Sequence, residues 1–309
     1  MKILMINSTY GGVSGSGRAV KLLSEELVKR GLKIDLLTER TMGSLRVPKL
    51  RSLSFALLAR LKEKEKYDII HVHNPKLSIA VRESSNNVLT VHGDFLGELQ
   101  RLYGRTTARI LDIWFSWERR KFRAITCVSP YWSQLRGWMY VPNGLDLGTI
   151  AAIAPSRERS ILFVGRKDKI KGYDIFEQAV KKTKYRYRMF GVNETVSWEE
   201  VIAHMKSAHC LVLPSEHEGM PYVILEAFAC GCPVIATDLP TLRSFGEGAI
   251  HFLEKRDVRS VKKAIEKVTE NQALWQALRR RALEKAEQYD IRKVADQYLS
   301  IYRQIGVSS

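Results

Sequence analysis

Short apolar runs alternate with amphipathic stretches along the whole chain, and this alternation is the feature that most limits its possible folds. A first run at residues 2–7 ends at a glycine- and serine-rich loop, an amphipathic stretch continues to Gly31, and a second run follows at 34–38. A strand, a helix and a strand in this order form a βαβ unit, which predicts a parallel sheet. Further runs lie at residues 68–73, 87–92, 124–129 and 138–142.

The alternation starts again after residues 143–159, a stretch with a turn motif and little periodicity that we interpret as a linker. The second series of apolar runs occupies residues 160–165, 186–190, 209–214, 233–237 and 249–252. Helical patterns follow Gly172, Ser197, Pro221 and Asp257, and helical sequence continues to about residue 305. The sequence therefore predicts two doubly wound α/β domains, with ligands at the carboxyl ends of the strands and in the cleft between the domains.

Charge is the unusual part of the composition. The 309 residues, enough for about two domains, carry 50 Lys and Arg against 33 Asp and Glu, a net charge of +17. The first 150 residues hold 24 of the basic and 13 of the acidic side chains. Such an excess indicates an acidic partner, which composition leaves open as nucleic acid, anionic lipid or a phosphorylated small molecule. Four cysteines are too few for a disulfide scaffold, so we expect a cytoplasmic protein.

The glycine-rich loop at 11–17 comes close to two nucleotide-binding motifs and satisfies neither. Gly12 and Gly17 have the spacing of a P-loop, but Arg18 stands where the motif requires lysine. A dinucleotide motif that starts at Gly15 would need glycine where Val20 stands. The loop can still bring backbone N–H groups to a phosphate at a helix N-terminus, or it is only a strand–helix turn.

Basic and acidic side chains follow predicted strands of the second half. Arg166 and Lys171 come after the strand at 160–165 and just before a helix, where together they could bind a diphosphate without a metal, or be solvated surface charges. Glu218 lies in the loop before Pro221, and Glu226 lies inside an otherwise apolar helix. A carboxylate at such an internal position is paired or functional, unless that face of the helix is exposed.

The remaining histidines and cysteines are expected to be structural. His71 and His73 lie on one predicted strand, and we expect them to point to opposite faces, which would exclude a shared metal. Cys230 and Cys232 flank Gly231 at a helix end and are expected to be small buried residues, not a redox pair.

Several of these segments, in this order, resemble the retaining glycosyltransferases of family four, which have the GT-B fold. The Glu218-x7-Glu226 motif with Pro214-Ser215 before it and residues 229–237 after it carries the strongest resemblance. The other matching segments are Val164-Gly165-Arg166 with Lys171-Gly172, residues 141–146, residues 68–73, Thr90-Val91-His92-Gly93 and the loop pair Ser14-Gly15.

The resemblance implies a role for each matching residue. Glu226 would bind the ribose hydroxyls of a nucleotide, and Arg166 and Lys171 would bind the diphosphate, which is also the leaving group. Glu218, with backbone N–H groups of Gly219, Met220 and Tyr222 nearby, would contact the donor sugar. His92 would face the anomeric carbon, and Gly15 would let the first loop close over the phosphates. The chain has no Asp-x-Asp, so we expect no metal and no cofactor besides the donor, UDP- or GDP-linked.

Two features depart from the family pattern. Only residues 191–196 stand where the family has a further strand and helix that help to hold the base, which leaves the nucleotide open. The N-terminal domain is also short for the family, which suggests a small or open acceptor pocket.

Two basic stretches of the N-terminal half, 46–66 and 101–123, mix Lys and Arg with apolar and aromatic residues. For the first we expect only packing against the sheet. For the second stretch two alternatives stay open: packing against the sheet, or peripheral contact with an anionic membrane at the inner membrane face.

The sequence thus predicts a GT-B protein with two Rossmann-like domains. Residues 1–145 would bind the acceptor, residues 146–290 the nucleotide-sugar, and a helix at 291–309 would cross back to the first domain. The expected activity is retaining, metal-independent transfer of a sugar from a nucleotide diphosphate sugar to an unknown glycan or lipid-linked acceptor. A nucleotide-sugar epimerase of the same fold and a basic nucleic-acid-binding protein are the alternatives, although nucleic acid is not the expected partner.

Overall fold

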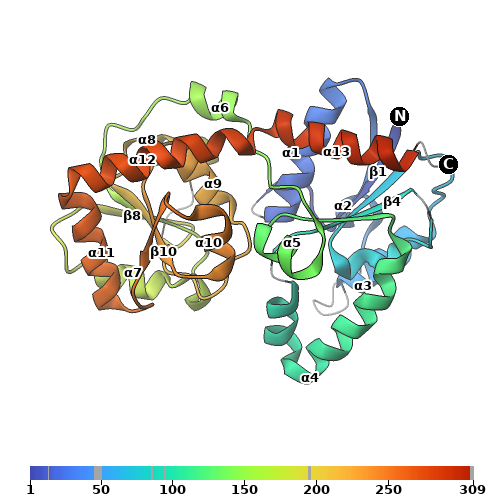
Figure 1. Cartoon of the computed structure of the whole chain (residues 1–309), viewed down its shortest axis with the longest axis horizontal. Coiled ribbons are helices and arrows are strands. Elements are labelled where there is room, and N and C mark those ends of the chain that lie inside the picture. Colours follow the sequence, from blue (N-terminus) through green and yellow to red (C-terminus); the bar gives the residue numbers. More distant parts are fainter. Residues whose placement is uncertain (13, 45–50, 85, 94, 194–195, 307–309) are drawn as a thin grey trace. The chain divides into compact units, whose positions relative to one another are not determined.

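The computed structural model describes residues 1–12, 14–44, 51–84, 86–93, 95–193 and 196–306, without the side chains of 95, 96, 98, 99 and 101–103. The chain divides into two compact units, shown in Figure 1. The N-terminal unit is Met1–Gly144 with Ile291–Ser309, and the C-terminal unit is Leu145–Asp290. The start of the basic stretch at 46–66 lies outside the described residues. None of the helices in the described part of the chain is both long and apolar enough to span a membrane.

The N-terminal unit is built on a parallel sheet of six strands in the order β2-β1-β3-β4-β5-β6. These strands are β1 (Lys2–Ile6), β2 (Lys33–Leu37), β3 (Ile69–His73), β4 (Asn87–Val91), β5 (Ala124–Cys127) and β6 (Met139–Tyr140). All six coincide with predicted apolar runs. The chain leaves β1 toward β2 on one side and returns to β3 on the other, so a topological switch point lies between β1 and β3.

Helices cover both faces of this sheet. They are α1 (Gly15–Lys29), α2 (Glu39–Met42), α3 (Arg51–Arg60), α4 (Phe95–Glu118), α5 (Pro130–Arg136), α13 (Ile291–Gly306) and the 3-10 turns η1 (Pro75–Ala80) and η2 (Arg119–Lys121). On one face Phe55 of α3 and Phe115 of α4 share a core with Leu77 of η1. On the other face α1 packs with α13, whose Tyr302 is fully buried. Figure 1 shows α13 and α4 on opposite sides of the sheet.

The C-terminal unit is built on a parallel sheet of five strands in the order β11-β10-β9-β7-β8. The strands are β7 (Ile161–Val164), β8 (Tyr187–Phe190), β9 (Cys210–Leu213), β10 (Val234–Thr237) and β11 (Ile250–Leu253). The chain runs from β7 to β8 on one side and then to β9 on the other. The switch point of this unit therefore lies between β7 and β9.

The helices of this unit include two that begin directly after the predicted positions Ser197 and Asp257. They are α6 (Leu147–Ala152), α7 (Tyr173–Val180), α8 (Trp198–Ser207), α9 (Tyr222–Ala229), α10 (Pro240–Gly246), α11 (Val258–Glu270), α12 (Gln272–Ala286), with the 3-10 turns η3 (Lys169–Lys171) and η4 (Glu287–Tyr289). Ser197 accepts a hydrogen bond from the Glu200 amide (3.1 Å), and Asp257 accepts one from the Ser260 amide (2.7 Å). Each cap satisfies a backbone donor that the first helical turn leaves free.

One expectation about this unit is wrong in part. The stretch taken as a linker contains α6, whose Ile150 is buried, because six residues are too few to show a helical period. The helical sequence after Asp257 is three helices, since Asn271 caps α12 by accepting a hydrogen bond from the Leu274 amide at 2.9 Å. The third, α13, belongs to the contacts of the N-terminal unit.

Candidate active site

An ion pair lies at the switch point of the C-terminal unit. Lys171 is the last residue of η3, which follows β7, and Glu218 lies in the loop after β9. Lys171 Nζ donates a hydrogen bond to Glu218 Oε1 at 2.7 Å, with 23% of the lysine and 6% of the glutamate side chain exposed. Burial of a carboxylate is costly unless it is paired, so the lysine makes this position of Glu218 possible.

Three contacts hold the two loops together beneath the pair. Gly172 has φ +71°, and a Cβ there would lie 2.3 Å from the Pro214 carbonyl oxygen, so only glycine fits. The Glu216 amide donates to the Ile170 carbonyl at 2.7 Å. Arg256 donates from Nε to the Pro214 carbonyl (2.8 Å) and from Nη2 to the Lys169 carbonyl (2.6 Å). Arg256 was not predicted from the sequence, because it lies beyond β11 and belongs to no motif.

Arg166 lies near the same edge of the sheet but is not part of this cluster. It follows Gly165, whose amide donates to the Phe190 carbonyl at 3.0 Å and so joins the ends of β7 and β8. Its side chain is exposed and forms no ion pair with any described residue. The structure thus brings Lys171 and Glu218 together and leaves the Arg166 guanidinium in solvent.

Helix α9 and the loop before it hold the rest of the predicted donor residues. Glu226 is buried, and its Oε1 accepts a hydrogen bond from Trp198 Nε1 at 2.5 Å. The indole therefore satisfies part of the carboxylate that the sequence expected to be paired or functional. Trp198 itself was missed, because nothing in the sequence places the first turn of α8 beside α9.

The loop before α9 is fixed from its far side. Thr241 Oγ1 donates to the Glu218 carbonyl at 2.7 Å, which anchors the loop to α10. Gly219 and Met220 follow in the loop, and Tyr222 is the first residue of α9, with Met220 and Tyr222 buried. These residues therefore stand next to the ion pair at the N-terminus of a helix, where backbone N–H groups lack intrahelical partners.

In the N-terminal unit His92 comes directly after β4 and contacts a second histidine. His73 Nδ1 and His92 Nε2 lie 3.1 Å apart, and the rings of His71 and His73 are tilted by 34° to each other with centroids 3.8 Å apart. The expectation that His71 and His73 point to opposite faces is wrong, because residues two apart on a strand share a face. Within the described part of the chain no three or more His, Cys, Asp or Glu residues are grouped so that they could hold a metal ion.

Burial keeps these histidines neutral. Desolvation lowers the pKa of His92 to about 4, although a hydrogen bond with Asn143 works in the opposite direction. Desolvation lowers the pKa of His71 to about 3 and that of His73 well below its usual value. His92 therefore acts at neutral pH as an uncharged group. Asn143, in the predicted interdomain segment, was not expected to contact it.

Deeper in the sheet, hydroxyl groups satisfy His71. Its Nδ1 lies 2.6 Å from the Tyr302 hydroxyl and its Nε2 lies 2.7 Å from Thr90 Oγ1. Thr90 Oγ1 in turn lies 3.0 Å from the Tyr298 hydroxyl. Because both tyrosines belong to α13, the end of the chain contributes to the polar interior beneath His92.

The first loop is held by Gly17 and not by Gly15. A Cβ at Gly17 would lie 2.5 Å from Thr9 Oγ1, whereas one at Gly15 would meet no atom within 4 Å. Asn7, buried at the end of β1, donates to the Thr9 carbonyl at 2.8 Å. Gly15 is thus exposed at the start of α1, where its small size is not required by packing.

A strained residue marks the switch point of the N-terminal unit. Asn74, just after β3, has φ 140°, and its Oδ1 accepts a hydrogen bond from the Lys76 amide at 2.9 Å. Non-glycine residues rarely adopt this conformation, and such strain concentrates at functional sites. The sequence analysis did not single out Asn74, although the Asn74-Pro75 dipeptide after a strand indicates a turn.

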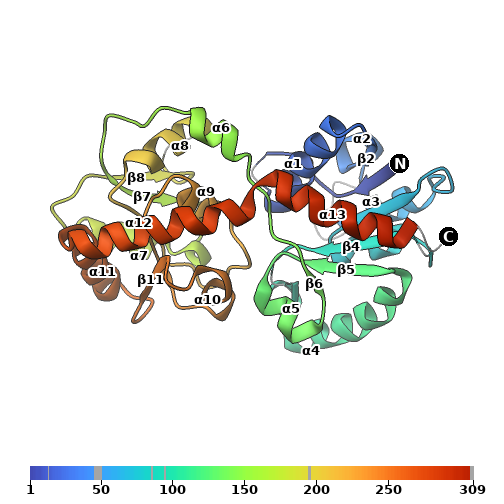
Figure 2. The ribbon, with the colours of Figure 1, turned by 45° about the horizontal axis from the view of Figure 1, so that its top comes forward.

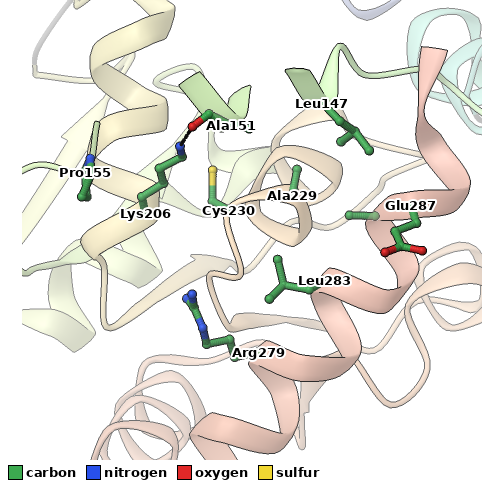
Figure 3. Close-up of a pocket in the computed structure, with 10 residues that line it drawn as sticks. Leu147, Ala151, Pro155, Lys206, Ala229, Cys230, Arg279, Leu283 and Glu287 are labelled. Carbon is green, nitrogen blue, oxygen red and sulfur yellow. Dashed lines mark hydrogen bonds between the residues drawn. The ribbon is translucent and has the colours of Figure 1, made fainter. Parts of the chain in front are cut away.

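A cavity of about 500 Å³ in the C-terminal unit lies away from these loops (Figure 3). Lys206 at its wall donates to the Ala151 carbonyl at 3.0 Å, as Figure 3 shows, and Arg279 donates to the Gly231 carbonyl at 3.0 Å. Both cations are therefore engaged with backbone oxygens. Cys230 lines this cavity, and Cys230 and Cys232 are buried free thiols, as expected.

Comparison with known proteins identifies the chain. The family model described as Glycosyltransferase Family 4 matches residues 13–135, and that described as Glycosyl transferases group 1 matches residues 188–289, so that the two cover most of both sheets. The chain is a member of the group 1, family 4 glycosyltransferases. The two alternatives, an epimerase and a nucleic-acid-binding protein, receive no support from these matches.

Full-length relatives and solved structures agree with this assignment. An uncharacterized glycosyltransferase of Methanocaldococcus jannaschii is 25% identical over 99% of each chain. The UDP-Gal:alpha-D-GlcNAc-diphosphoundecaprenol alpha-1,3-galactosyltransferase of Escherichia coli is 24% identical over 72% of this glycosyltransferase and 71% of the relative. Sucrose-phosphate synthase of Thermosynechococcus elongatus superposes with a TM-score of 0.79 at 18% identity, over 100% of each chain, and shows the GT-B fold.

Proposed function

We propose that this glycosyltransferase transfers a sugar, with retention of configuration and without a metal, from a nucleotide diphosphate sugar to a glycan or a lipid-linked acceptor. The observation that carries the proposal is the Lys171–Glu218 pair, whose 2.7 Å contact lies at the switch point between β7 and β9. Ligands of doubly wound sheets bind at this place. The C-terminal unit would bind the nucleotide-sugar, UDP- or GDP-linked, and the N-terminal unit the acceptor.

The diphosphate would bind to Lys171 and Arg166. Lys171 already neutralises Glu218, so an arriving diphosphate would share the ammonium group with that carboxylate, while the exposed Arg166 guanidinium is free to grip two phosphate oxygens. As the glycosidic bond breaks, negative charge grows on the diphosphate, and both cations stabilise it. They would supply the electrostatic stabilisation that a metal gives other transferases.

The donor sugar and ribose would bind to the loop and to α9. Glu218 would accept hydrogen bonds from sugar hydroxyls beside the amides of Gly219, Met220 and Tyr222, and Glu226 would accept them from the ribose. The acceptor hydroxyl would attack the anomeric carbon on the face that the diphosphate leaves, and a donor phosphate oxygen would take its proton. No side chain is therefore assigned as general base.

His92 and Gly15 complete the proposal in the N-terminal unit. His92, held neutral by burial, would contact the sugar near the anomeric carbon, and Gly15 would leave room for phosphates at the first loop. For the acceptor, the E. coli relative and a Campylobacter jejuni relative are named for substrates attached to diphosphoundecaprenol. These names favour a lipid-linked acceptor and a protein that works at the inner membrane face from the cytoplasm.

A binding and product analysis tests the proposal. UDP- and GDP-sugars are screened by calorimetry with and without EDTA, and the anomer of the product is identified by NMR. We expect binding in EDTA and a product with the donor configuration. Binding to none of these donors, loss of activity in EDTA or an inverted product would overturn the proposal.

Substitutions assign the roles. Arg166→Ala and Lys171→Met should each lower kcat about a hundredfold, since they remove charge stabilisation that grows in the transition state. Glu226→Gln should mainly weaken donor binding. Lys167→Ala is the control, because Lys167 is next to Arg166 and is also exposed. It should change neither kcat nor donor binding. Equal effects of Lys167→Ala and Arg166→Ala on kcat would contradict a specific role of Arg166.

A further inference from the structure

Helix α4 carries an apolar stripe that the protein does not bury. Ala108 and Phe115 of this helix pack into the core on the sheet. On the opposite side Ile110, Ile113 and Trp117 are 61%, 65% and 72% exposed. Their spacing of three and four residues places them on one face of the helix. The sequence left open whether α4 packs on the sheet or contacts a membrane, and the structure gives it two apolar faces, of which only one packs on the sheet.

Helix α3 repeats this arrangement on the same face of the sheet. Its Phe55, Ala56 and Ala59 are buried in the core that also contains Phe115, whereas Leu53 and Leu57 are exposed. For this helix we expected only packing on the sheet. The exposed leucines show that α3 also has an apolar face that does not pack there. Figure 2 shows α3 and α4 in the N-terminal unit, where both contact η1. Exposed apolar residues gathered on neighbouring elements mark interaction surfaces.

The charge beside the stripe is positive. The two acidic side chains of residues 104–123 are already paired, Asp112 with Arg136 (3.2 Å) and Glu118 with Lys121 (2.7 Å). Five exposed arginines form no ion pair with a described residue: Arg105, Arg109, Arg119, Arg120 and Arg123. The surface therefore combines apolar residues with uncompensated positive charge.

We propose that the exposed faces of α3 and α4 bind the surface of an anionic lipid bilayer. An amphipathic helix lies in the membrane interface when its apolar residues enter the acyl boundary and its basic residues meet anionic headgroups. Trp117 at the end of the stripe fits this position, because indole rings favour the interface. Nucleic acid would use the arginines but not the isoleucine and leucine stripes. The proposal goes beyond the transferase reaction and is tested without it.

Flotation of the full chain with vesicles is the direct test. We expect binding to vesicles of phosphatidylcholine with about 40 mol% phosphatidylglycerol, because basic residues are attracted to an anionic surface, and none to pure phosphatidylcholine. Ile113→Ser with Trp117→Ser should lower the partition coefficient at least about tenfold, since the stripe loses its apolar area. Arg105→Ala with Arg109→Ala should lower it about 25-fold, since each basic residue near the surface contributes about fivefold.

Matched controls separate the surface from general effects. Val28→Ser removes an exposed apolar side chain of α1, and Arg157→Ala with Lys182→Ala removes two exposed cations of the C-terminal unit. These variants should bind vesicles as the parent does. Circular dichroism and the calorimetric donor screen on every variant show that the fold and donor binding are intact, so failure here is distinct from failure of the proposed reaction.

Three results would overturn the proposal. The first is absence of binding to anionic vesicles. The second is binding that the Ile113→Ser, Trp117→Ser variant retains. The third is a concentration-dependent dimer in sedimentation velocity that this variant abolishes, which would make the stripe a contact between two copies of the chain.

Discussion

Glu218 and Glu226 are buried carboxylates of the C-terminal unit, and each has a hydrogen-bond partner from a distant part of the chain. Glu226 was expected to be paired or functional because it lies inside an apolar helix, and both Glu226 and Glu218 are buried with a partner. The partners were not predictable in the same way. Lys171 lies 47 positions from Glu218, and Trp198 lies 28 from Glu226. Only the packing of neighbouring loops and helices brings such residues together.

The Lys171–Glu218 pair should be strongly coupled in stability. Lys171→Met leaves the buried carboxylate of Glu218 without a counter-charge and should lower the free energy of unfolding by about 3 kcal/mol. With Glu218→Gln in addition, the loss should be smaller than the sum of the single losses. A double-mutant cycle by urea unfolding should give a coupling energy of about 1–3 kcal/mol.

Lys181 and Glu177 provide the matched control for this cycle. Their Nζ and Oε1 atoms are also 2.7 Å apart, but the side chains are 57% and 33% exposed. Solvent screening should limit their coupling energy to about 0.5 kcal/mol. Equal coupling in the two pairs would show that burial does not strengthen the Lys171 contact.

The buried histidines should make stability depend on pH. His71 and His92 titrate near pH 6.5 when unfolded, but burial lowers their pKa to about 3 and about 4 in the folded protein. The unfolded chain therefore binds more protons below pH 6.5, and stability falls as the pH drops from there toward 4. The slope should reach about 1.4 kcal/mol per pH unit for each histidine.

Midpoints of urea unfolding, measured between pH 7.5 and 5.0, test this pH dependence of stability. His71→Gln should remove about one proton from the slope. A slope that His71→Gln does not change would contradict the buried, neutral state of His71.

At the scale of elements, glycine positions decide how close two loops come. Gly172 and Gly137 both have positive φ, +71° and +68°, but only at Gly172 would a Cβ meet other atoms. Either Gly→Ala change costs about 1–2 kcal/mol for the left-handed conformation. Gly172→Ala should cost about 1–3 kcal/mol more, since η3 must move from Pro214.

Thermal or urea unfolding of the two variants measures this difference. Gly172→Ala should also weaken donor binding in the calorimetric screen, because Lys171 precedes the displaced residue, while Gly137→Ala should not. Equal losses of stability would mean that the approach of η3 to Pro214 adds no constraint.

The pattern of apolar residues predicted the strands well. All eleven strands of the described part of the chain match apolar runs, and most of them are buried, because strands of a covered parallel sheet are continuously apolar. The edge strand β2 and the short strand β6 match as well, although neither has a buried residue. Capping side chains marked the starts of α8 and α11, and Gly172 and Pro221 marked the starts of α7 and α9. Short or interrupted elements were not predicted. Helix α6 is too short to show a helical period, and the break at Asn271 depends on a side-chain cap.

At the scale of the whole molecule, each unit has its own core, and α13 joins the core of the N-terminal unit. Tyr302→Ala should cost about 4 kcal/mol, from the cavity and from the lost contact with His71. Hydrogen exchange should then accelerate in β1, β3 and β4 but not in β9 and β10.

Phe163→Ala is the reciprocal control, since Phe163 is fully buried in the core of the C-terminal unit. It should accelerate exchange in β7 and β9 and leave β1 and β3 protected. Exchange that rises equally in both sheets for either variant would contradict two separate cores.

Sequence patterns alone predicted the fold class, the order of the strands along the chain and the residue types of the loops at the candidate donor site. Periodicity, caps and motif spacing depend on residues that are close together in the sequence, so they can be recognised from the sequence alone. Tertiary structure alone decided the partners: Lys171 with Glu218, Trp198 with Glu226, Arg256 across two loops, and α13 beneath His71. It also decided that Ile113 and Trp117 stay outside the core. A helix with two apolar faces has only one sheet to pack on, and which face is buried depends on the packing of the whole unit.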